Sequence, residues 1–233
     1  MRIPWYILAN SILALFSCSG AADKNPQETK ADTVKIETVL KKGDADSFLA
    51  LFSEIAVDTF HVYSEPDFYE DPKFRGRQIG QEFNHFFTFD TNLTYSLTDE
   101  RGGKDSFYAC YKFKLAADKT GLLIRIPSLY GITAVNLFIW DNKKNHLATR
   151  ENLSDGYGDE GWYFVQDAWI SDFKKDGLVD FLRRRKDRDV NMDDTTQVSS
   201  SDSISVFLAR GNKFKKHTLP IDTSKFELKS WKP

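Results

Sequence analysis

The stretch Asp172–Asp180, which reads DFKKDGLVD, has the residue types and spacing of a calcium-binding loop. Aspartates stand at positions 1, 5 and 9, and a glycine at position 6 permits a sharp turn. Calcium takes about six to eight oxygen ligands, so three carboxylates and a backbone carbonyl would supply part of its shell. Position 3, where such loops have Asp or Asn, is Lys174. The pattern therefore predicts either a calcium site at Asp172, Asp176 and Asp180 or a loop whose aspartates are neutralised by Lys174.

The neighbourhood of this loop resembles one unit of the FG-GAP/VCBS repeats of integrin-like propellers. The matching residues are the aspartates and the glycine of the loop, followed by the hairpin-like stretch Ile204–Phe214. The resemblance occurs once, so it implies a degenerate calcium-type loop between two strands and not a complete propeller. The chain is also similar in this respect to surface lipoproteins of unknown function from Bacteroidetes-like bacteria.

Acidic and aromatic residues that precede the loop in the sequence form a second candidate site. Asp155, Asp159 and Glu160 carry carboxylates that could hold an ion or accept hydrogen bonds from hydroxyl groups. Trp162 and Trp169 could stack on a sugar ring. The alternative for the acidic residues is a solvated turn, and the alternative for the tryptophans is the core of a strand-rich domain. These five residues are predicted to bind a ligand.

No spacing typical of catalysis accompanies these residues. The chain has no G-x-S-x-G, P-loop or H-E-x-x-H pattern, and its four histidines are scattered without metal-ligand spacing. We therefore expect a non-enzymatic protein with a binding or assembly role. The enzymatic alternative is a hydrolase of envelope glycan that uses loop carboxylates. A second alternative is a lipoprotein that captures a carbohydrate or another ligand.

The N-terminus has the order of a lipoprotein signal peptide. Arg2 precedes the apolar stretch Ile7–Phe16, which is shorter than the about 20 residues that a membrane-spanning helix needs. The sequence Leu-Phe-Ser before Cys18 then resembles a bacterial lipobox, which implies that Cys18 is acylated, for example with palmitate, and becomes the new N-terminus. Cleavage a few residues later would instead give a soluble secreted protein, and an uncleaved segment would be an anchor.

These features predict a lipid-anchored cell-envelope protein, placed on the outer membrane, with a glycan or an envelope protein as partner. Cys110 would then have no cysteine partner, because only two cysteines are present. The net charge of −2 gives no electrostatic reason to bind nucleic acid. The expected organisation is a signal peptide at 1–17, a flexible polar tether at 18–32 and a single domain at 33–233. Within the domain we expect two sub-units, at 33–150 and 155–220.

The rest of the chain predicts a mainly β fold, because aromatic residues make up 14% of the sequence and strand-like alternation recurs. Phe107–Leu115 alternates apolar and polar residues, which places Cys110 on the polar face. Two runs of strands are separated by a turn-rich segment at 152–161, and 189–203 is predicted as a loop. We expect an antiparallel sandwich or two packed meander sheets, with short helices near the N-terminus.

Overall fold

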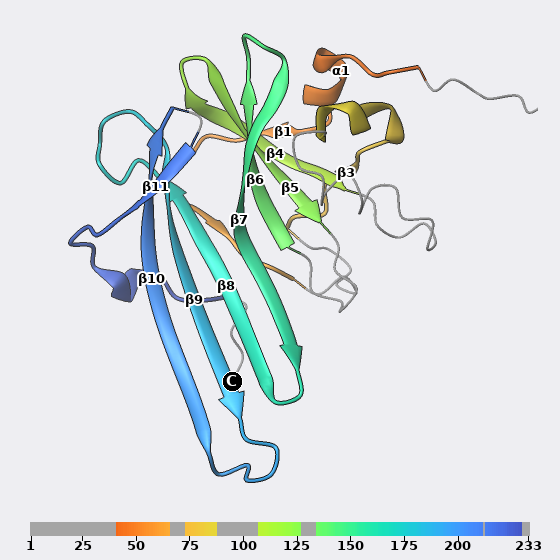
Figure 1. Cartoon of the computed structure of the whole chain (residues 1–233). Helices are drawn as coiled ribbons and strands as arrows, with labels where there is room; N and C mark the ends of the chain where they lie inside the picture. Colours follow the sequence, from red (N-terminus) through yellow and green to blue (C-terminus); the bar gives the residue numbers. More distant parts are fainter. Residues whose placement is uncertain (1–40, 66–72, 88–106, 127–133, 212, 230–233) are drawn as a thin grey trace, which may run out of the picture. The chain divides into compact units, whose positions relative to one another are not determined.

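The described part of the chain belongs to one compact unit, Val39–Pro233, shown in Figure 1. The computed structural model describes residues 41–65, 73–87, 107–126, 134–211 and 213–229. No helix in these ranges is long and apolar enough to cross a membrane. The predicted signal peptide, the tether and Cys18 lie outside the described residues, and these assignments stay predictions.

The described residues form one large sheet that is mostly antiparallel, which confirms the mainly β prediction. Its 11 strands run in the order β1-β4-β5-β6-β7-β8-β9-β10-β11, while β2 pairs with β8 and β3 with β4. The pairing of β1 with β4 is parallel. The strands are β1 Ser53–Glu54, β2 Phe60–Val62, β3 Arg77–Gln78, β4 Tyr108–Ala116, β5 Lys119–Ile126, β6 Ala134–Asp141, β7 His146–Asp159, β8 Trp162–Ser171, β9 Asp180–Val190, β10 Val198–Arg210 and β11 Lys213–His217.

Helical segments are few and short in the described ranges, and two of them lie near the N-terminus, as expected. They are α1 Ala45–Leu49, η1 Gln81–Phe87 and η2 Thr223–Lys225, of which the last two are 3-10 helices. Phe48 of α1 and Phe87 of η1 are fully buried against Phe138 and Trp140 of β6. This packing covers one face of the central strands.

The opposite face of the same strands packs against the second half of the sheet. Leu123 of β5 and Leu137 of β6 share a core cluster with Ala168 and Ile170 of β8 and Phe181 of β9. The strand β7 makes this possible, since it pairs with β6 up to Ser154 and with β8 beyond that residue. The central strands are therefore buried on both faces.

Cys110 is buried, and its predicted place on a polar face of the strand is wrong. The register of β4 against β5 shifts between Ala109 and Tyr111. This irregularity reverses the alternation, so that Ala109 packs in one core cluster while Cys110 and Phe113 pack in the other. The Cys110 thiol donates to Phe74 O at 3.2 Å. Its role is packing in the core.

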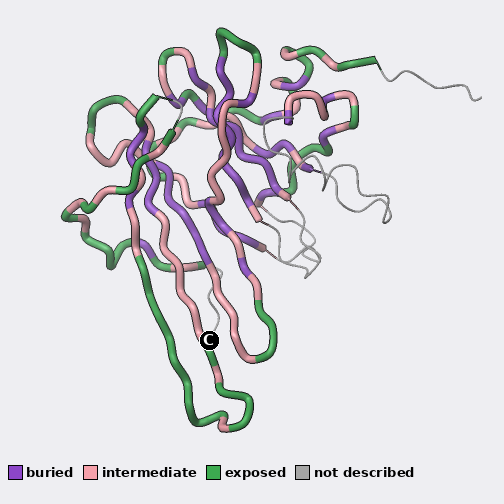
Figure 2. Tube along the Cα trace, viewed as in Figure 1, coloured by how far each residue is buried: buried purple, intermediate pink, exposed green. Residues whose placement is uncertain are grey.

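The far ends of four strands form a polar extension of the sheet, which we call the arm. Figure 2 shows that exposure rises toward its tip. The predicted turn at 152–161 is wrong in extent, because β7 continues to Asp159, and the predicted loop at 189–203 is wrong in part, because β10 begins at Val198. In the β10 part, Ser199–Ser203 are all polar, so cross-strand hydrogen bonding extends the ladder there without an apolar face to signal it. The arm comprises Asp155–Asp159 of β7, Trp162–Asp167 of β8, Arg184–Val190 of β9 and Val198–Ile204 of β10.

The C-terminal residues Leu219–Lys229, which we call the strap, cover one face of the sheet next to the arm. Phe226 packs edge-on against Trp169 with ring centroids 5.3 Å apart, in a third cluster with Leu182 and Val206. Arg184 Nη1 donates to Phe226 O at 2.7 Å. Because Trp169 alternates with Ala168 and Ile170 along β8, the strap lies on the face opposite to the first core cluster.

Candidate functional site

The calcium-type loop connects β8 to β9 and is closed by its own backbone. Asp172 accepts hydrogen bonds from Asp176 N at 3.1 Å and from Gly177 N at 2.7 Å. Gly177 has a φ of +80°, a conformation that side chains rarely adopt, which explains the glycine. Asp176 in turn accepts from Leu178 N at 3.1 Å. Two of the three predicted calcium ligands thus shape the turn.

Lys174 pairs with Asp176, while Asp180 is buried in the sheet. The hydrogen bond from the Lys174 ammonium holds the pKa of Asp176 below its usual range. Asp180 is 1% exposed and accepts from Ala209 N at 2.8 Å, and burial raises the pKa of its carboxyl. Its Oδ2 has no hydrogen-bond partner in the described part of the chain. In those residues no three His, Cys, Asp or Glu side chains are grouped as metal ligands would be. The geometry shows a self-closed loop, and calcium binding stays a prediction.

Three of the five predicted ligand-binding residues lie on one face of the arm. Paired residues in neighbouring strands project to the same side of a sheet. Asp159 pairs with Trp162, and Asp155 pairs with Gln166. Trp162, Phe164 and Gln166 are alternate residues of β8, so their side chains lie on the same side of the sheet. We call this side the aromatic face. Its three rows are Asp159, Trp162, Asp189 and Ser199; Tyr157, Phe164, Asp187 and Ser201; and Asp155, Gln166, Arg185 and Ser203.

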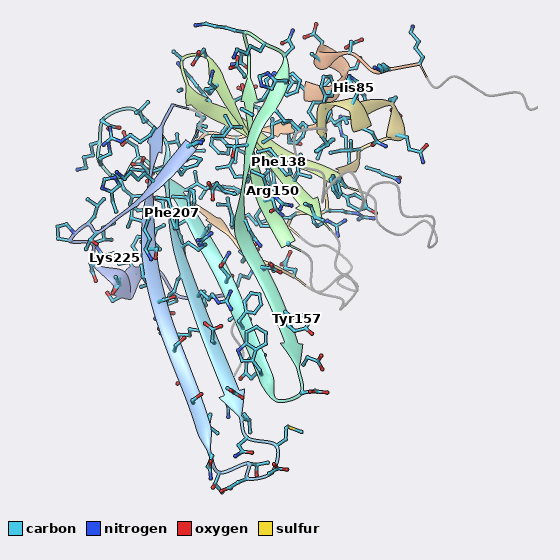
Figure 3. All side chains as sticks on the ribbon, viewed as in Figure 1. His85, Phe138, Arg150, Tyr157, Phe207 and Lys225 are labelled. Carbon is cyan, nitrogen blue, oxygen red and sulfur yellow. The ribbon has the colours of Figure 1, made fainter. Side chains whose placement is uncertain are left out.

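The aromatic rings of this face touch one another and remain partly exposed. The centroid of Trp162 lies 5.9 Å from that of Tyr157 and 5.5 Å from that of Phe164. The Arg185 guanidinium covers Phe164 at 3.9 Å and binds Asp187 through both carboxylate oxygens. Figure 3 shows Tyr157 on the lower part of β7. Trp162 and Tyr157 are both partly exposed on this face.

A hollow at the tip continues the row that contains Trp162. It has a volume of about 590 Å³ and includes Asp189 and Ser199 of that row together with Glu160, the fourth predicted residue. Met192 is 66% exposed there and Val198 is 46% exposed. The hollow adds apolar and acidic groups next to the aromatic face.

The two faces of the arm differ in charge. Carboxylates on the aromatic face outnumber its one arginine, and Arg185 is occupied by Asp187. The opposite face carries Arg184, Lys186 and Arg188, with Asp202 bound to Arg184 at 2.6 Å and to Lys186 at 3.7 Å. The arm is thus acidic and aromatic on one side and basic on the other.

Trp169, the fifth predicted residue, lies on the opposite side of β8 and away from the aromatic face. It is 5% exposed and stacks on the His61 ring with centroids 4.3 Å apart. His61 Nε2 lies 2.9 Å from Asp167 Oδ2, which also accepts from Lys229 N at 2.8 Å. This His–Asp pair was missed in the sequence because 106 residues separate its members. Trp169 serves packing under the strap.

Lysines and aromatic rings surround the His–Asp pair. Lys229 Nζ donates to Tyr63 OH at 2.5 Å, and Lys73 Nζ donates to His61 O at 2.9 Å. Lys73 also lies 4.2 Å from the centroid of the Phe60 ring, and burial lowers the pKa of its ammonium. These contacts tie β2, β8 and the strap together.

Comparisons with known proteins add no relative. No protein-family model matches the chain, no curated protein matches it, and no solved structure matches its fold.

Proposed function

We propose that this chain is a lipid-anchored cell-envelope protein that binds glycan and has no enzymatic activity of its own. The observation that carries the proposal is the aromatic face of the arm, where Trp162 and Tyr157 are partly exposed and flanked by carboxylates. Rings of this kind expose a flat apolar surface beside polar groups, which is the composition of a ligand site.

A sugar ring fits this surface chemically. Its C–H face would lie on the indole of Trp162, and its hydroxyl groups would donate to Asp159 and Asp189, which flank Trp162 on the neighbouring strands. The excess of carboxylates favours neutral or amine-bearing sugars over acidic ones, because like charges repel. The site therefore selects for uncharged or cationic glycan.

The enzymatic alternative receives less support from the same residues. A glycosidase needs two carboxyl groups on either side of the scissile bond. Asp155, Asp159 and Asp189 share one open face of a sheet, so they are not opposed across a cleft. We accordingly propose a binding role.

The anchor and the finer architecture are part of the proposal. Acylation of Cys18 would hold the protein at the outer membrane, with residues 18–32 as a flexible spacer between lipid and domain. The shared core of β5, β6, β8 and β9 supports a sandwich-like packing of the two halves of the sheet. If Cys18→Ala still partitions with membranes, the lipid anchor is refuted.

A glycan panel tests the binding role. The full chain, purified in detergent, is incubated with immobilised neutral, amine-bearing and acidic glycans, alongside Trp162→Ala. We expect retention on the neutral or amine-bearing members and its loss in Trp162→Ala. Retention that is equal in both proteins, or absent throughout the panel, would refute the proposal.

A further inference from the structure

The outer edge of β10 is unpaired over the length of the arm. Its last residues, Val206–Arg210, pair with β11, whereas no described residue pairs with the outer edge of Val198–Ser205. Such an edge presents a row of backbone N–H and C=O groups that can accept another strand. Figure 1 shows this part of β10 as the outermost strand of its sheet.

The residues that point their amides outward can be identified. Ala209 N donates to Asp180 Oδ1 on the side of β9, so odd-numbered residues of β10 point their N–H toward β9. Amide directions alternate along a strand of an antiparallel pair. Ser200, Asp202 and Ile204 therefore direct their N–H and C=O groups away from the sheet.

This edge lacks the usual protection against pairing. Natural edge strands carry Lys, Pro or a bulge, or are covered by another segment. Val198–Ser205 contains none of these residues, and its pairing with β9 shows no register shift. Its one charged residue, Asp202, is neutralised by Arg184 and Lys186. Neither a free charge nor a break in the register therefore prevents another strand from pairing with this edge.

We propose that this edge pairs with the same edge of a second copy of the chain, antiparallel and centred on Ser201. A two-fold axis perpendicular to the sheet at Ser201 pairs every residue from Val198 to Ile204. It places Val198 opposite Ile204 of the second copy and Ser200 opposite Asp202. Centring the axis on Asp202 would pair as many residues, Ser199 to Ser205, but it would set two aspartates against each other.

The self-complementary register is the reason to assign a second copy as the occupant. An isologous contact uses the same patch on both subunits, and this register satisfies that condition with an apolar pair and no like-charge pair. The two-fold axis also keeps the aromatic faces of both arms on the same side. The pair would present two such faces on one continuous sheet.

A cysteine at the axis tests the register directly. Ser201 and its counterpart form a non-hydrogen-bonded pair, in which the Cα atoms lie about 4.5 Å apart, within the range for a disulfide. We expect the full chain carrying Ser201→Cys to form a covalent dimer under mild oxidation. In Ser203→Cys the two cysteines would lie about 14 Å apart along the strands, so its dimer should form at least tenfold more slowly.

A proline removes the contact without removing the cysteine. Ser200→Pro, added to Ser201→Cys, deletes an outward N–H that is not needed inside the sheet, and we expect at least a tenfold slower cross-link. Ser200→Ala keeps the amide and should keep the rate. Equal rates for Ser201→Cys and Ser203→Cys, no dimer from Ser201→Cys, or no effect of proline would each overturn the proposal.

Discussion

Replacing Asp167 with alanine removes the buried carboxylate that joins β2, β8 and the strap. Its Oδ2 accepts from His61 Nε2 at 2.9 Å and from Lys229 N at 2.8 Å, and the side chain is fully buried. A hydrogen bond to a charged group contributes about 1.5–3 kcal/mol. Because both donors converge on one oxygen, their contributions are not additive. We expect Asp167→Ala to lower the free energy of unfolding by about 3 kcal/mol.

Thermal and urea unfolding of the full chain measure this loss. For a domain of this size about 1 kcal/mol shifts Tm by about 2–4 °C, so we expect a fall of about 6–12 °C. Limited proteolysis should also release the strap earlier in Asp167→Ala than in the unaltered chain. Asp189→Ala is the matched control, since Asp189 is exposed, and it should change the stability by less than about 0.5 kcal/mol. A loss below about 1 kcal/mol in Asp167→Ala would refute the role assigned to the carboxylate.

Three further measurements concern single side chains. The hydrogen bond from Lys119 lowers the pKa of Asp141 to about 2. The ionised Asp141 carboxylate should therefore contribute fully to stability above about pH 4, and this contribution should be lost as the pH falls toward 2. Acid unfolding of Asp141→Asn should lack this loss. Burial raises the pKa of the Cys110 thiol to about 12, and alkylation at pH 8 should therefore occur only after unfolding. Millimolar calcium should leave Tm unchanged if Lys174 closes the loop, as its pairing with Asp176 indicates. A rise in Tm that is lost in Asp180→Asn would instead show that calcium binds to the loop.

The sheet could be anticipated from the sequence where one face of a strand is buried. The stretch from Ala134 to Asp141 is apolar except for Asn136 and Asp141, and it forms a strand buried on both faces. The turn after Ser171 was recognisable because Gly177 and the aspartates have specific backbone roles. These signals are local, and a short window of residues contains them.

The β10 part of the arm could not be anticipated, because it carries no such signal. The residues Val198–Ser203 are exposed and, apart from Val198, polar, and only pairing with β9 makes them a strand. The reversal at Cys110 depends on a register shift against β5 that leaves no mark in the sequence. Likewise, the partner of His61 lies on a distant strand. Each of these features depends on contacts between residues far apart in the chain.

The aromatic face was predicted in part. Asp155, Asp159 and Trp162 were recognised as candidates, and the structure places them on one face. Trp169 was assigned to the same site, but it packs under the strap. The seven-residue interval between the tryptophans puts them on opposite sides of β8.

Calorimetric titration with a neutral or amine-bearing glycan that the panel retains tests the central claim most directly. If the sugar covers about 60 Å² of the Trp162 indole at about 25 cal/mol per Å², stacking is worth about 1.5 kcal/mol, or about tenfold in Kd. We predict at least a tenfold rise in Kd for Trp162→Ala and less than a twofold change for Tyr163→Ala, which alters the opposite face of the same strand. Equal losses in the two variants, or no loss in Trp162→Ala, would contradict a glycan site on the aromatic face.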